Sequence, residues 1–416
     1  MKFKRALEGI KVADFSWAAA APLATRYLAD FGATVVRIES HRKPDTVRLG
    51  RPFKDNIPGI NRSGFYTNFN SSKYGVSLDI SMPKGQEVAK RFIKWADIVV
   101  ESFTPGIAKK NGFDYETVRQ FKPEIVYVSS SQHGQSGPYA KIPGYGFHAA
   151  SAAGVFNFCG WPERPPVAAY GAYTDYTSPP ITVVTIMAAL DYRRRTGIGQ
   201  YIDISQVETA IHQLAPAIMD YEVNGRIQGR SGNHLDYAAP HGAYRCKRKD
   251  EWCVIAIFTD REWRAFCETI GNPNWTYEER FNTLTGRKQH EDELDKLVES
   301  WTKNHEKEEI MTLMQKSGIR VGMVETVEDL FEDPQLKHRN HFRVLEHTAM
   351  GRCAYDAPPY RLSRTPDCQS AAPCLGEHNE RVYKDFLGMS GDEIADLLIE
   401  GVITTDTDMT AFRSPY

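Results

Sequence analysis

The chain has 416 residues, which is more than one compact core usually holds, so two domains are expected. Its 51 basic and 53 acidic residues give a formal charge of -2, so neither nucleic acid nor an anionic membrane is expected as a partner. No apolar run approaches the roughly 20 residues of a membrane span. The seven cysteines show no C-x-x-C or zinc spacing, so no metal site is predicted. Together with an N-terminus that lacks an apolar signal segment, they favour a reducing cytoplasm.

The first 130 residues alternate between strand-like and helical patterns. Strands are expected at 10–16, at 34–40 and in the segments GVSLDI, DIVVES and EIVYVSSS, and helices in PLATRYLADFGA and KGQEVAKRFIKWA. This alternation predicts a parallel sheet with right-handed crossovers, in which ligands bind beyond the carboxyl ends of the strands. We therefore expect one crevice, lined by DFSWAAAAP, VVESFTPG and YVSSSQHGQSGP.

A helix is expected next, running to about residue 195 and closed by Gly197. Ser178 precedes Pro179 and Pro180, a pattern typical of a helix N-cap followed by its first turn. The segment QYIDIS predicts another strand, and VETAIHQLAPAIMDYEVNGR predicts one long helix.

The region from about 226 to 325 changes character, with turns, a strand in EWCVIAIF and helices rich in Trp, Glu and Lys. It predicts a second, smaller α+β domain. Near the C-terminus, YRLSRTPDCQSAAPC is expected to be a poorly structured surface stretch. The last helix is expected in SGDEIADLLIEGVI, with Ser390 and Glu393 as a capping box.

Asp175 is the acid best placed for chemistry, because it lies between Tyr173 and Tyr176 just before an apolar helix. A capping or loop role is the ordinary explanation for such an acid. The chemical explanation is that its carboxylate attacks an activated acyl group and forms a mixed anhydride. That reaction needs an apolar surround and N–H donors for the oxyanion, which the tyrosines and the helix N-terminus could supply. The residues alone leave both roles open.

Other motifs are weaker. The turn SWAAAAP lacks the glycines of a dinucleotide-binding fingerprint, and GQSGP is not the G-x-S-x-G of a serine hydrolase. His133, His148 and His241 are isolated and are expected to be structural. Lys109 and Lys110 follow a strand near a helix start, where they either face solvent or contact a phosphate.

The order of these segments resembles the class III CoA-transferases, the family of formyl-CoA and carnitine CoA-transferases. The resemblance covers nearly the whole chain and rests on segments in a shared order: LEGIKVADFSWAAAAPLATRYLADFGATVVRIES, WADIVVESFTPG, IVYVSSSQHGQSGPY, TDYTSPPITVVTIMAALDYRRRTGIGQYIDIS, VETVEDLFEDPQLKHRNHF and LGEHNE. It implies an α/β fold whose large Rossmann-like domain, with a parallel sheet, is built from both chain ends, plus the smaller α+β domain. The expected divisions are 1–205 for the first part of the large domain, 206–225 for a linker helix, 226–325 for the small domain, and 326–416 for the return linker and the rest of the large domain.

The same resemblance implies the chemistry. Asp175 would be the nucleophile of a CoA-transferase that works through an aspartyl anhydride and an aspartyl-CoA thioester, with CoA thioesters as substrates and no prosthetic group. By position, the CoA contacts would be Ala19, Ala20, Arg42, Leu78, Ser102, Phe103, Thr104, Lys110 and Tyr145. Two subunits would interlock like rings, as a homodimer or as a heteromer with a homologous subunit.

The chain departs from the family pattern beside the nucleophile. Gly146 stands where the family often has an acid, and Ala150 stands where it often has a glutamine, so the oxyanion donors are open. Two other functions compete with transfer. A 2-methylacyl-CoA racemase shares the fold and needs a histidine base, for which His133 or His148 could serve. A catalytically silent partner subunit of a heteromer is the second alternative.

The substrates are expected to be succinyl-CoA as the donor and benzylsuccinate, or another aromatic or dicarboxylic acid, as the acceptor. This hypothesis rests on a likeness to the benzylsuccinate CoA-transferase type and on a ring-rich surround of Asp175: Tyr145, Phe147, Phe156, Phe158, Trp161, Tyr170, Tyr173 and Tyr176. Arg42, Lys141 and Arg164 could pair with a second carboxylate. The competing interpretation is that these rings belong to the core.

Overall fold

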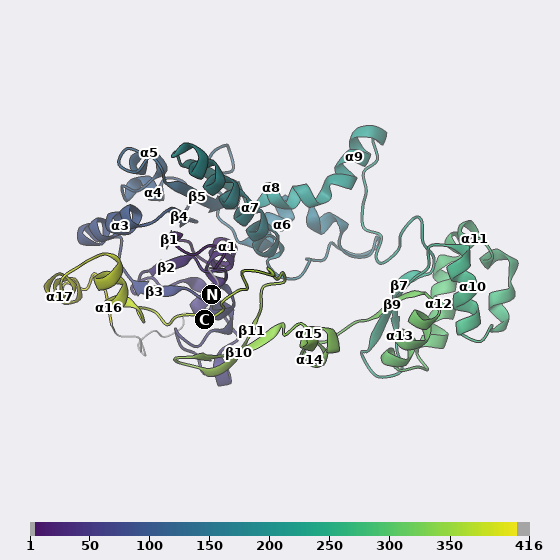
Figure 1. Ribbon diagram of the computed structural model, residues 1–416. Helices are drawn as coiled ribbons and strands as arrows, with labels where there is room; N and C mark the ends of the chain where they lie inside the picture. Colours follow the sequence, from purple (N-terminus) through teal and green to yellow (C-terminus); the bar gives the residue numbers. More distant parts are fainter. Residues whose placement is uncertain (1–4, 406–416) are drawn as a thin grey trace. The chain divides into compact units, whose positions relative to one another are not determined.

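The computed structural model describes residues 5–405 and contains a sheet of six parallel strands in the order β3-β2-β1-β4-β5-β6 (Figure 1). The strands are β1 Lys11–Asp14, β2 Thr34–Glu39, β3 Tyr74–Ser77, β4 Ile98–Glu101, β5 Val126–Ser131 and β6 Gln200–Ser205. After β1 the chain builds outward through β2 and β3, and then returns to place β4 on the other side of β1. This reversal forms the crevice at which doubly wound sheets bind ligands. The predicted parallel α/β sheet is therefore confirmed, and all six strands come from residues 11–205.

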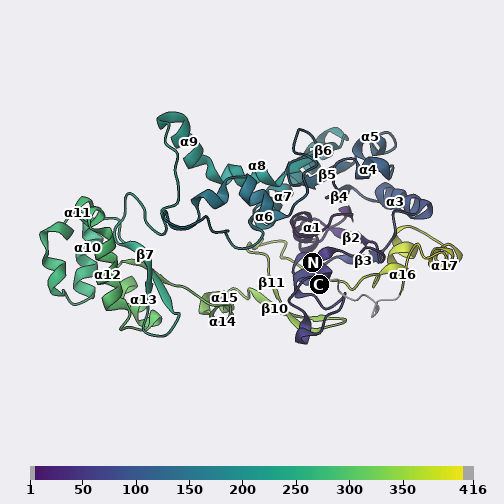
Figure 2. The same cartoon turned by 180° about the vertical axis from the view of Figure 1, so that it is seen from behind.

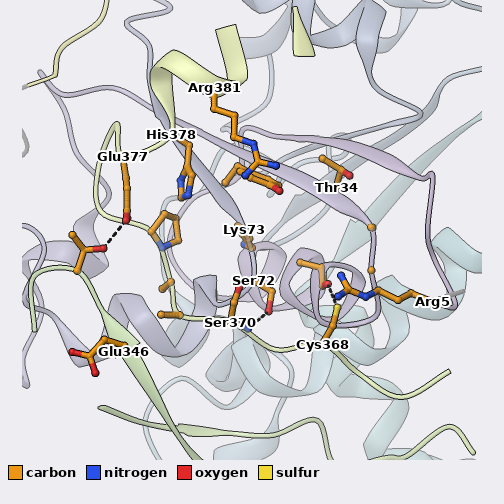
Figure 3. A pocket seen from close by; sticks show the side chains of 18 residues that line it. Arg5, Thr34, Ser72, Lys73, Glu346, Cys368, Ser370, Glu377, His378 and Arg381 are labelled. Carbon is orange, nitrogen blue, oxygen red and sulfur yellow. Dashed lines mark hydrogen bonds between the residues drawn. The ribbon is translucent and has the colours of Figure 1, made fainter. Parts of the chain in front are cut away.

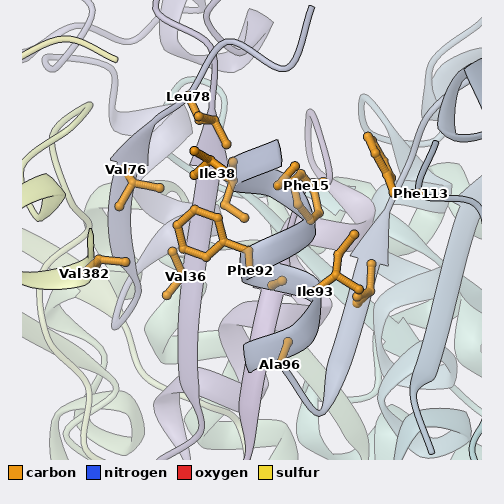
Figure 4. Close-up of a cluster of buried hydrophobic side chains, with 14 of the residues drawn as sticks. Phe15, Val36, Ile38, Val76, Leu78, Phe92, Ile93, Ala96, Phe113 and Val382 are labelled. Atoms are coloured by element: carbon orange, nitrogen blue, oxygen red, sulfur yellow. The ribbon is translucent and has the colours of Figure 1, made fainter. Parts of the chain in front are cut away.

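Alternation along the strands gives the sheet two apolar faces. On one face Val12, Val35 and Val100 pack against helices α1 (Ala20–Asp30) and α7 (Tyr173–Thr196). On the other face the neighbouring residues Ala13 and Val36 pack against α3 (Pro83–Trp95), as Figure 4 shows for Val36 and Phe92. Helices on both faces bury the inner strands of the sheet, which explains why β4 and β5 are continuous apolar runs, whereas the edge strand β6 keeps Tyr201 and Asp203 exposed.

The shorter helices of this part lie mostly in the connections: α2 Gly64–Asn70, α4 Ile107–Lys110, α5 Tyr115–Val118, α6 Gly146–Ala152, α8 Gln206–Ile211 and α9 Ala215–Asn224. The single long helix expected after β6 is wrong, because a 3-10 turn at His212–Leu214 separates α8 from α9. Pro216 stands in the first turn of α9, where its missing N–H could not continue α8. No helix within residues 5–405 is both long enough and apolar enough to cross a bilayer.

The C-terminal part adds a hairpin, helices and core side chains rather than strands of the main sheet. Its elements are β10 Phe342–His347, β11 Gly351–Asp356, α16 Asn379–Arg381 and α17 Gly391–Ile399. The capping box of Ser390 and Glu393 on α17 is confirmed. The stretch 360–374 lacks regular structure as expected, but its placement on the surface is wrong at its end. Ala372 and Cys374 are buried, and Pro373 lies so close to Gly75 of β3 that a Cβ there would meet it at 2.8 Å.

The chain divides into two compact units. The larger contains the residues up to Phe156, Ala168–Ile227 and the residues from Lys337 onward, and the smaller contains Asn157–Val167 and Gln228–Leu336. In the smaller unit an antiparallel sheet in the order β7-β8-β9 packs against helices α12 and α13 (Figure 2). Its elements are β7 His241–Arg245, β8 Trp252–Ala256, β9 Arg320–Met323, α10 Asp260–Thr269, α11 Leu284–Gln289, α12 Glu291–Thr302, α13 Lys307–Lys316 and α14 Val327–Glu332, followed at the boundary by α15 Pro334–His338. This unit has its own apolar core, which includes Trp263, Phe266 and Phe281.

Candidate active site

A cavity of about 430 Å³ lies in the larger unit where β1, β4 and β5 end. Its walls are the turn at 17–21 after β1, the segment 102–105 after β4, residues 130–132 at the end of β5, and the loop 140–145 with Ile142 and Tyr145. Lys43 and Thr46 after β2, Asp175 in α7 and Gln206 at the start of α8 complete the lining. The expected crevice is confirmed, because each of the three predicted segments contributes to one wall.

Of the ten site residues named from the sequence, seven line this cavity: Asp175, Ala19, Ala20, Ser102, Phe103, Thr104 and Tyr145. Three others lie outside the lining. The Leu78 side chain is packed in the core, as Figure 4 shows. The Arg42 guanidinium lies 3.3 Å from the Asp79 carboxylate, and Lys110 is exposed at the end of α4. The cation that does line the cavity is Lys43, which the sequence analysis did not single out.

Asp175 lies in the first turn of α7, which begins at Tyr173. The prediction that Ser178 caps this helix is therefore wrong, since Ser178 is fully buried within it and the helix continues through Pro179 and Pro180. Pro179 and Pro180 have no N–H to donate to the carbonyls four residues back, so the helix lacks these two hydrogen bonds. Asp175 thus stands near the positive end of the helix dipole, which favours its carboxylate form.

Burial has the larger effect on this carboxylate. Asp175 is 8% exposed, and removal from water raises its pKa to about 6. Hydrogen bonds from the Gly146 backbone and the Gln206 side chain act in the opposite direction, and neither donor carries a charge. The side chain is therefore a carboxylate at neutral pH that no cation within residues 5–405 neutralises, which is a suitable state for a nucleophile.

Gly146 has to be a glycine in this arrangement. A Cβ at this position would lie 2.7 Å from the Cγ of Asp175, closer than real contacts allow. Gly146, where the family often has an acid, therefore has no side chain that would fill the space taken by the Asp175 carboxylate. It also brings its own backbone N–H to the carboxylate.

Gln206 is held in a defined orientation beside Asp175. The hydroxyl of Thr174, a fully buried residue, donates to Oε1 of Gln206 over 2.9 Å, which leaves the amide Nε2 free to face the carboxylate. Gln206 was not predicted as a site residue, because it is distant from Asp175 along the chain. The available signal was its place directly after strand β6, at the edge of the sheet where the site lies.

The turn after β1 carries backbone strain. Ala18 has a φ of 62°, in the left-handed region that most residues avoid. Its N–H donates to both carboxylate oxygens of Asp45 over 3.1 Å, and Asp45 is itself bound by the Arg37 guanidinium. These bonds to Asp45 hold the turn in place, so that Ala19 and Ala20, at the start of α1, line the cavity.

A second buried aspartate, Asp14, contacts the same Arg37 guanidinium that binds Asp45. Its carboxylate lies 3.0 Å from the Lys73 ammonium and 3.7 Å from the Arg37 guanidinium, and accepts from the Thr25 hydroxyl over 2.7 Å. Burial alone would raise the pKa of Asp14, but Lys73 and Arg37 outweigh it and lower the pKa. Asp14 is therefore a paired structural charge.

Histidines and most of the predicted aromatic rings lie elsewhere. None of the described residues that line the cavity is a histidine, and Nδ1 of His148 accepts the Tyr145 N–H over 3.2 Å. Of the eight rings expected around Asp175, Tyr145 alone is in the lining, where it is joined by Trp17 and Phe103. The Phe147 and Phe156 rings pack against each other, but Phe147 is 48% exposed and none of the eight rings is buried, so the competing interpretation that they belong to the core is wrong as well.

A second cavity, of about 440 Å³, lies at the opposite edge of the sheet, where β2 and β3 begin (Figure 3). Two of its charged side chains, Lys73 and Glu377, already have partners in the protein. The Lys73 ammonium binds Asp14, and the Glu377 carboxylate accepts from the Thr348 hydroxyl and the Cys374 N–H. We therefore assign the candidate site to the cavity of Asp175.

Comparison with known proteins agrees with this assignment. Residues 7–379 match the model of CoA-transferase family III. Similar proteins include the succinyl-CoA–D-citramalate CoA-transferase of Chloroflexus aurantiacus, 29% identical over 96% of this chain and 98% of that protein. Another is the succinate–glutarate CoA-transferase of Agrobacterium fabrum, 30% identical over 92% and 96%. A crystal structure of a CAIB/BAIF family protein from Brucella suis matches with a TM-score of 0.85 at 28% identity, covering 92% of this chain and 99% of that one. The chain belongs to CoA-transferase family III and is a transferase enzyme.

Proposed function

We propose that this chain acts in the cytoplasm as a CoA-transferase that moves CoA from succinyl-CoA to a second dicarboxylic acid, with Asp175 as the covalent nucleophile. The observation that carries the proposal is a buried carboxylate in a cavity at the carboxyl edge of the sheet, with no cation among the described residues paired to it. The two similar transferases described above are named for succinyl or succinate and for dicarboxylic acids, which supports the substrate class.

The reaction would begin when an Asp175 carboxylate oxygen attacks the acyl carbon of succinyl-CoA. The C–S bond breaks, CoA leaves as a thiolate, and a mixed anhydride remains on the enzyme. The thiolate then attacks Cγ of Asp175 and releases succinate, which leaves an aspartyl-CoA thioester. The acceptor carboxylate attacks Cγ in turn and displaces the thiolate, which finally attacks the acceptor's acyl carbon and restores the Asp175 carboxylate.

In this sequence Asp175 is first a nucleophile and then an electrophile. Each attack on Cγ places negative charge on the oxygen that Asp175 keeps. The Gly146 N–H and the Gln206 amide, which bind the resting carboxylate, are suited to hold that charge. Burial of the site supports the same steps, because water would hydrolyse the anhydride and the thioester.

Benzylsuccinate is the specific acceptor that we propose within the dicarboxylic class. Trp17, Phe103 and Tyr145 line the cavity and offer ring surface for its aryl group. A direct assay compares benzylsuccinate with citramalate, glutarate and oxalate as acceptors of CoA from succinyl-CoA. Preferred transfer to an acceptor without a ring would refute benzylsuccinate while leaving the transferase proposal intact.

We also propose that two copies interlock as a dimer, or that this chain pairs with a homologous subunit. Helix α9 supports an assembly, because apolar side chains are exposed along it, with Met219 at 55% and Val223 at 70%. Such surface is typically covered by a partner. Light scattering at micromolar concentration tests this point, and an active monomer would contradict it.

Mass spectrometry provides the central test of function. The protein is incubated with succinyl-CoA, digested rapidly and searched for a CoA adduct on the peptide that contains Asp175. We expect the adduct in the wild type and its loss in the Asp175→Asn variant. Wash-in of solvent deuterium at Cα of a 2-methylacyl-CoA, without transfer, would indicate a racemase instead. Absence of both reactions would indicate a silent partner subunit.

A further inference from the structure

The segment 102–105, which forms one wall of the candidate site, is held by a buried glutamate behind it. Glu101 is the last residue of β4 and is only 2% exposed. One of its carboxylate oxygens accepts the Phe103 N–H over 2.6 Å, and the other accepts the hydroxyl of Ser129, which lies opposite it on β5. Glu101 therefore ties the start of the wall to the end of the sheet.

The same wall has two further contacts, both with neighbouring turns. The Phe103 carbonyl accepts the side-chain amide of Gln135 over 3.3 Å, and the Gln135 N–H donates to the Asp203 carboxylate over 3.0 Å. The hydroxyl of Ser102 accepts the Trp17 N–H over 2.7 Å. The backbone of Phe103, which lines the cavity, is therefore held both at its N–H, by Glu101, and at its C=O.

Glu101 lies on the other side of the sheet from the nucleophile. Side chains alternate along a strand, so Glu101 points to the same face as Val99, which packs in the core with α3. Asp175 belongs to α7, which packs with Val100 on the opposite face. Loss of the Glu101 contacts would therefore loosen the wall 102–105 and leave the nucleophile and its helix in place.

We propose that Glu101 is a positioning residue for substrate binding, which fixes Ser102 and Phe103 in the cavity and so controls the affinity for CoA thioesters. A buried N–H without an acceptor is costly, so without Glu101 the wall should move until the Phe103 N–H reaches another acceptor or water. This inference rests on the proposed function of the Asp175 cavity. It adds a residue that acts through the wall and takes no part in the chemistry at Asp175.

The test compares variants that keep or remove the acceptor for the Phe103 N–H. Glu101→Gln keeps a carbonyl oxygen, whereas Glu101→Met has a similar length and no comparable acceptor. Asp97→Ala is the matched control, because Asp97 stands directly before the other end of β4 and accepts the Lys11 N–H over 2.8 Å. Burial raises the pKa of Glu101 to about 7, so all variants are measured at pH 8, where this carboxyl group is ionised.

Steady-state assays with succinyl-CoA and calorimetric titration with coenzyme A give KM, kcat and Kd. We expect Glu101→Met to raise KM and Kd by about tenfold and to keep kcat within about threefold of the wild type. Glu101→Gln should bring KM and Kd back to within about threefold of the wild type. Asp97→Ala should lower the thermal midpoint at unchanged KM, which is also the result that a purely structural role of Glu101 would give.

Unchanged KM and Kd in a Glu101→Met variant that is folded by circular dichroism would overturn the proposal, because the wall would then keep its place without Glu101. A lower kcat at unchanged KM would also overturn it, by placing Glu101 in the chemistry.

Gln135→Ala keeps the proposal testable if Glu101→Met does not fold. It releases the Phe103 carbonyl from the loop side without a change in the core, so it should raise KM in the same direction. Unchanged KM in this variant would show that substrate binding does not depend on how the wall is held. A wild-type protein that neither binds coenzyme A nor transfers it would instead refute the proposed function, before any variant is compared.

Discussion

Asp14 and Asp175 are buried aspartates in the same unit, but they differ in their charged partners and in the direction in which their pKa is shifted. Asp14 is fully enclosed and bound by Lys73, Arg37 and Thr25, so its pKa lies below the ordinary value. Asp175 keeps a small exposed fraction and is contacted by uncharged donors, so burial raises its pKa to about 6.

The difference separates a charge that holds the structure from one that can react. A buried carboxylate paired with cations is a weak nucleophile because its electrons are already engaged, and removing it leaves those cations unpaired. A buried carboxylate without a cation is destabilised by desolvation of its charge. Formation of the anhydride or the thioester removes that charge and so relieves the desolvation penalty. Substitution at the two positions should therefore give effects of different kinds.

The largest effect is expected from Asp175→Asn. Transfer should fall by roughly a thousandfold or more, because the amide cannot form the anhydride. The thermal midpoint should be equal to or above that of the wild type, since the variant removes an unpaired buried charge. Steady-state assay and calorimetry measure the two quantities, and a loss of stability would show that Asp175 supports the fold.

Asp14→Asn should show the reverse pattern. Loss of its charge leaves the Lys73 ammonium buried without its carboxylate, so the free energy of unfolding should fall by about 3–5 kcal/mol. Urea denaturation followed by fluorescence checks this value. The double variant Asp14→Asn, Lys73→Met should recover part of the loss, and equal stability of the wild type and the single variant would contradict the pairing.

Gln206→Leu should reduce kcat by roughly ten- to a hundredfold with a smaller change in KM, because the amide acts on charge that develops during the reaction. Thr174→Val should act in the same direction by freeing the amide to rotate. Thr174→Ser keeps the hydroxyl and is the matched control. A change in KM alone would place Gln206 in ordinary substrate binding.

The pH dependence of kcat/KM should reveal Asp175 directly. The carboxylate must be ionised to attack, so the rate should fall about tenfold per pH unit as the pH drops below about 6. In Gln206→Leu this acid limb should move to higher pH, because a donor that lowers the pKa of Asp175 has been removed. A rate that is flat down to pH 4.5 would assign the nucleophile to another group.

The smallest effect is expected from Lys43→Ala. Loss of one cation at the cavity should raise KM for all acyl-CoA donors by about three- to tenfold, with kcat unchanged. Arg42→Ala and Lys110→Ala, measured in the same assay, test the phosphate contacts implied by the family resemblance. A larger effect at either of these positions would move the phosphate site away from Lys43.

Local pattern predicted the strands of the large sheet well, because each is a short apolar run with helical segments on either side. Position relative to those strands was then enough to place Ala19, Ser102 and Thr104 in one crevice. The resemblance to a family, rather than the spacing of residues, singled out Asp175. The predicted start of α7 is wrong because Ser178 followed by two prolines has the sequence pattern of a cap, whereas the helix begins at Tyr173, nearly two turns earlier.

The residues that sequence reasoning missed meet only in three dimensions. Gln206 meets Asp175 only in the folded chain, and its place directly after strand β6 is the one signal that the sequence offers for it. Gly146 was noticed as a departure from the family, but its role depends on the Asp175 side chain, whose Cγ would lie 2.7 Å from any Cβ at position 146. Long-range distances of this kind have no local signature.

The make-up of the sheet's core also has a consequence for biosynthesis. The apolar layer around Phe92 is completed by Val382, which Figure 4 shows, and by Tyr383 and Val402 further along the chain. The ribosome finishes the sixth strand roughly 180 residues earlier, which corresponds to about 10–35 s of synthesis. During that interval one face of the finished sheet lacks its last covering, so the nascent chain carries an apolar surface that chaperones can bind. A stop codon just before Val382 should therefore yield an insoluble product even though every strand of the sheet has been made.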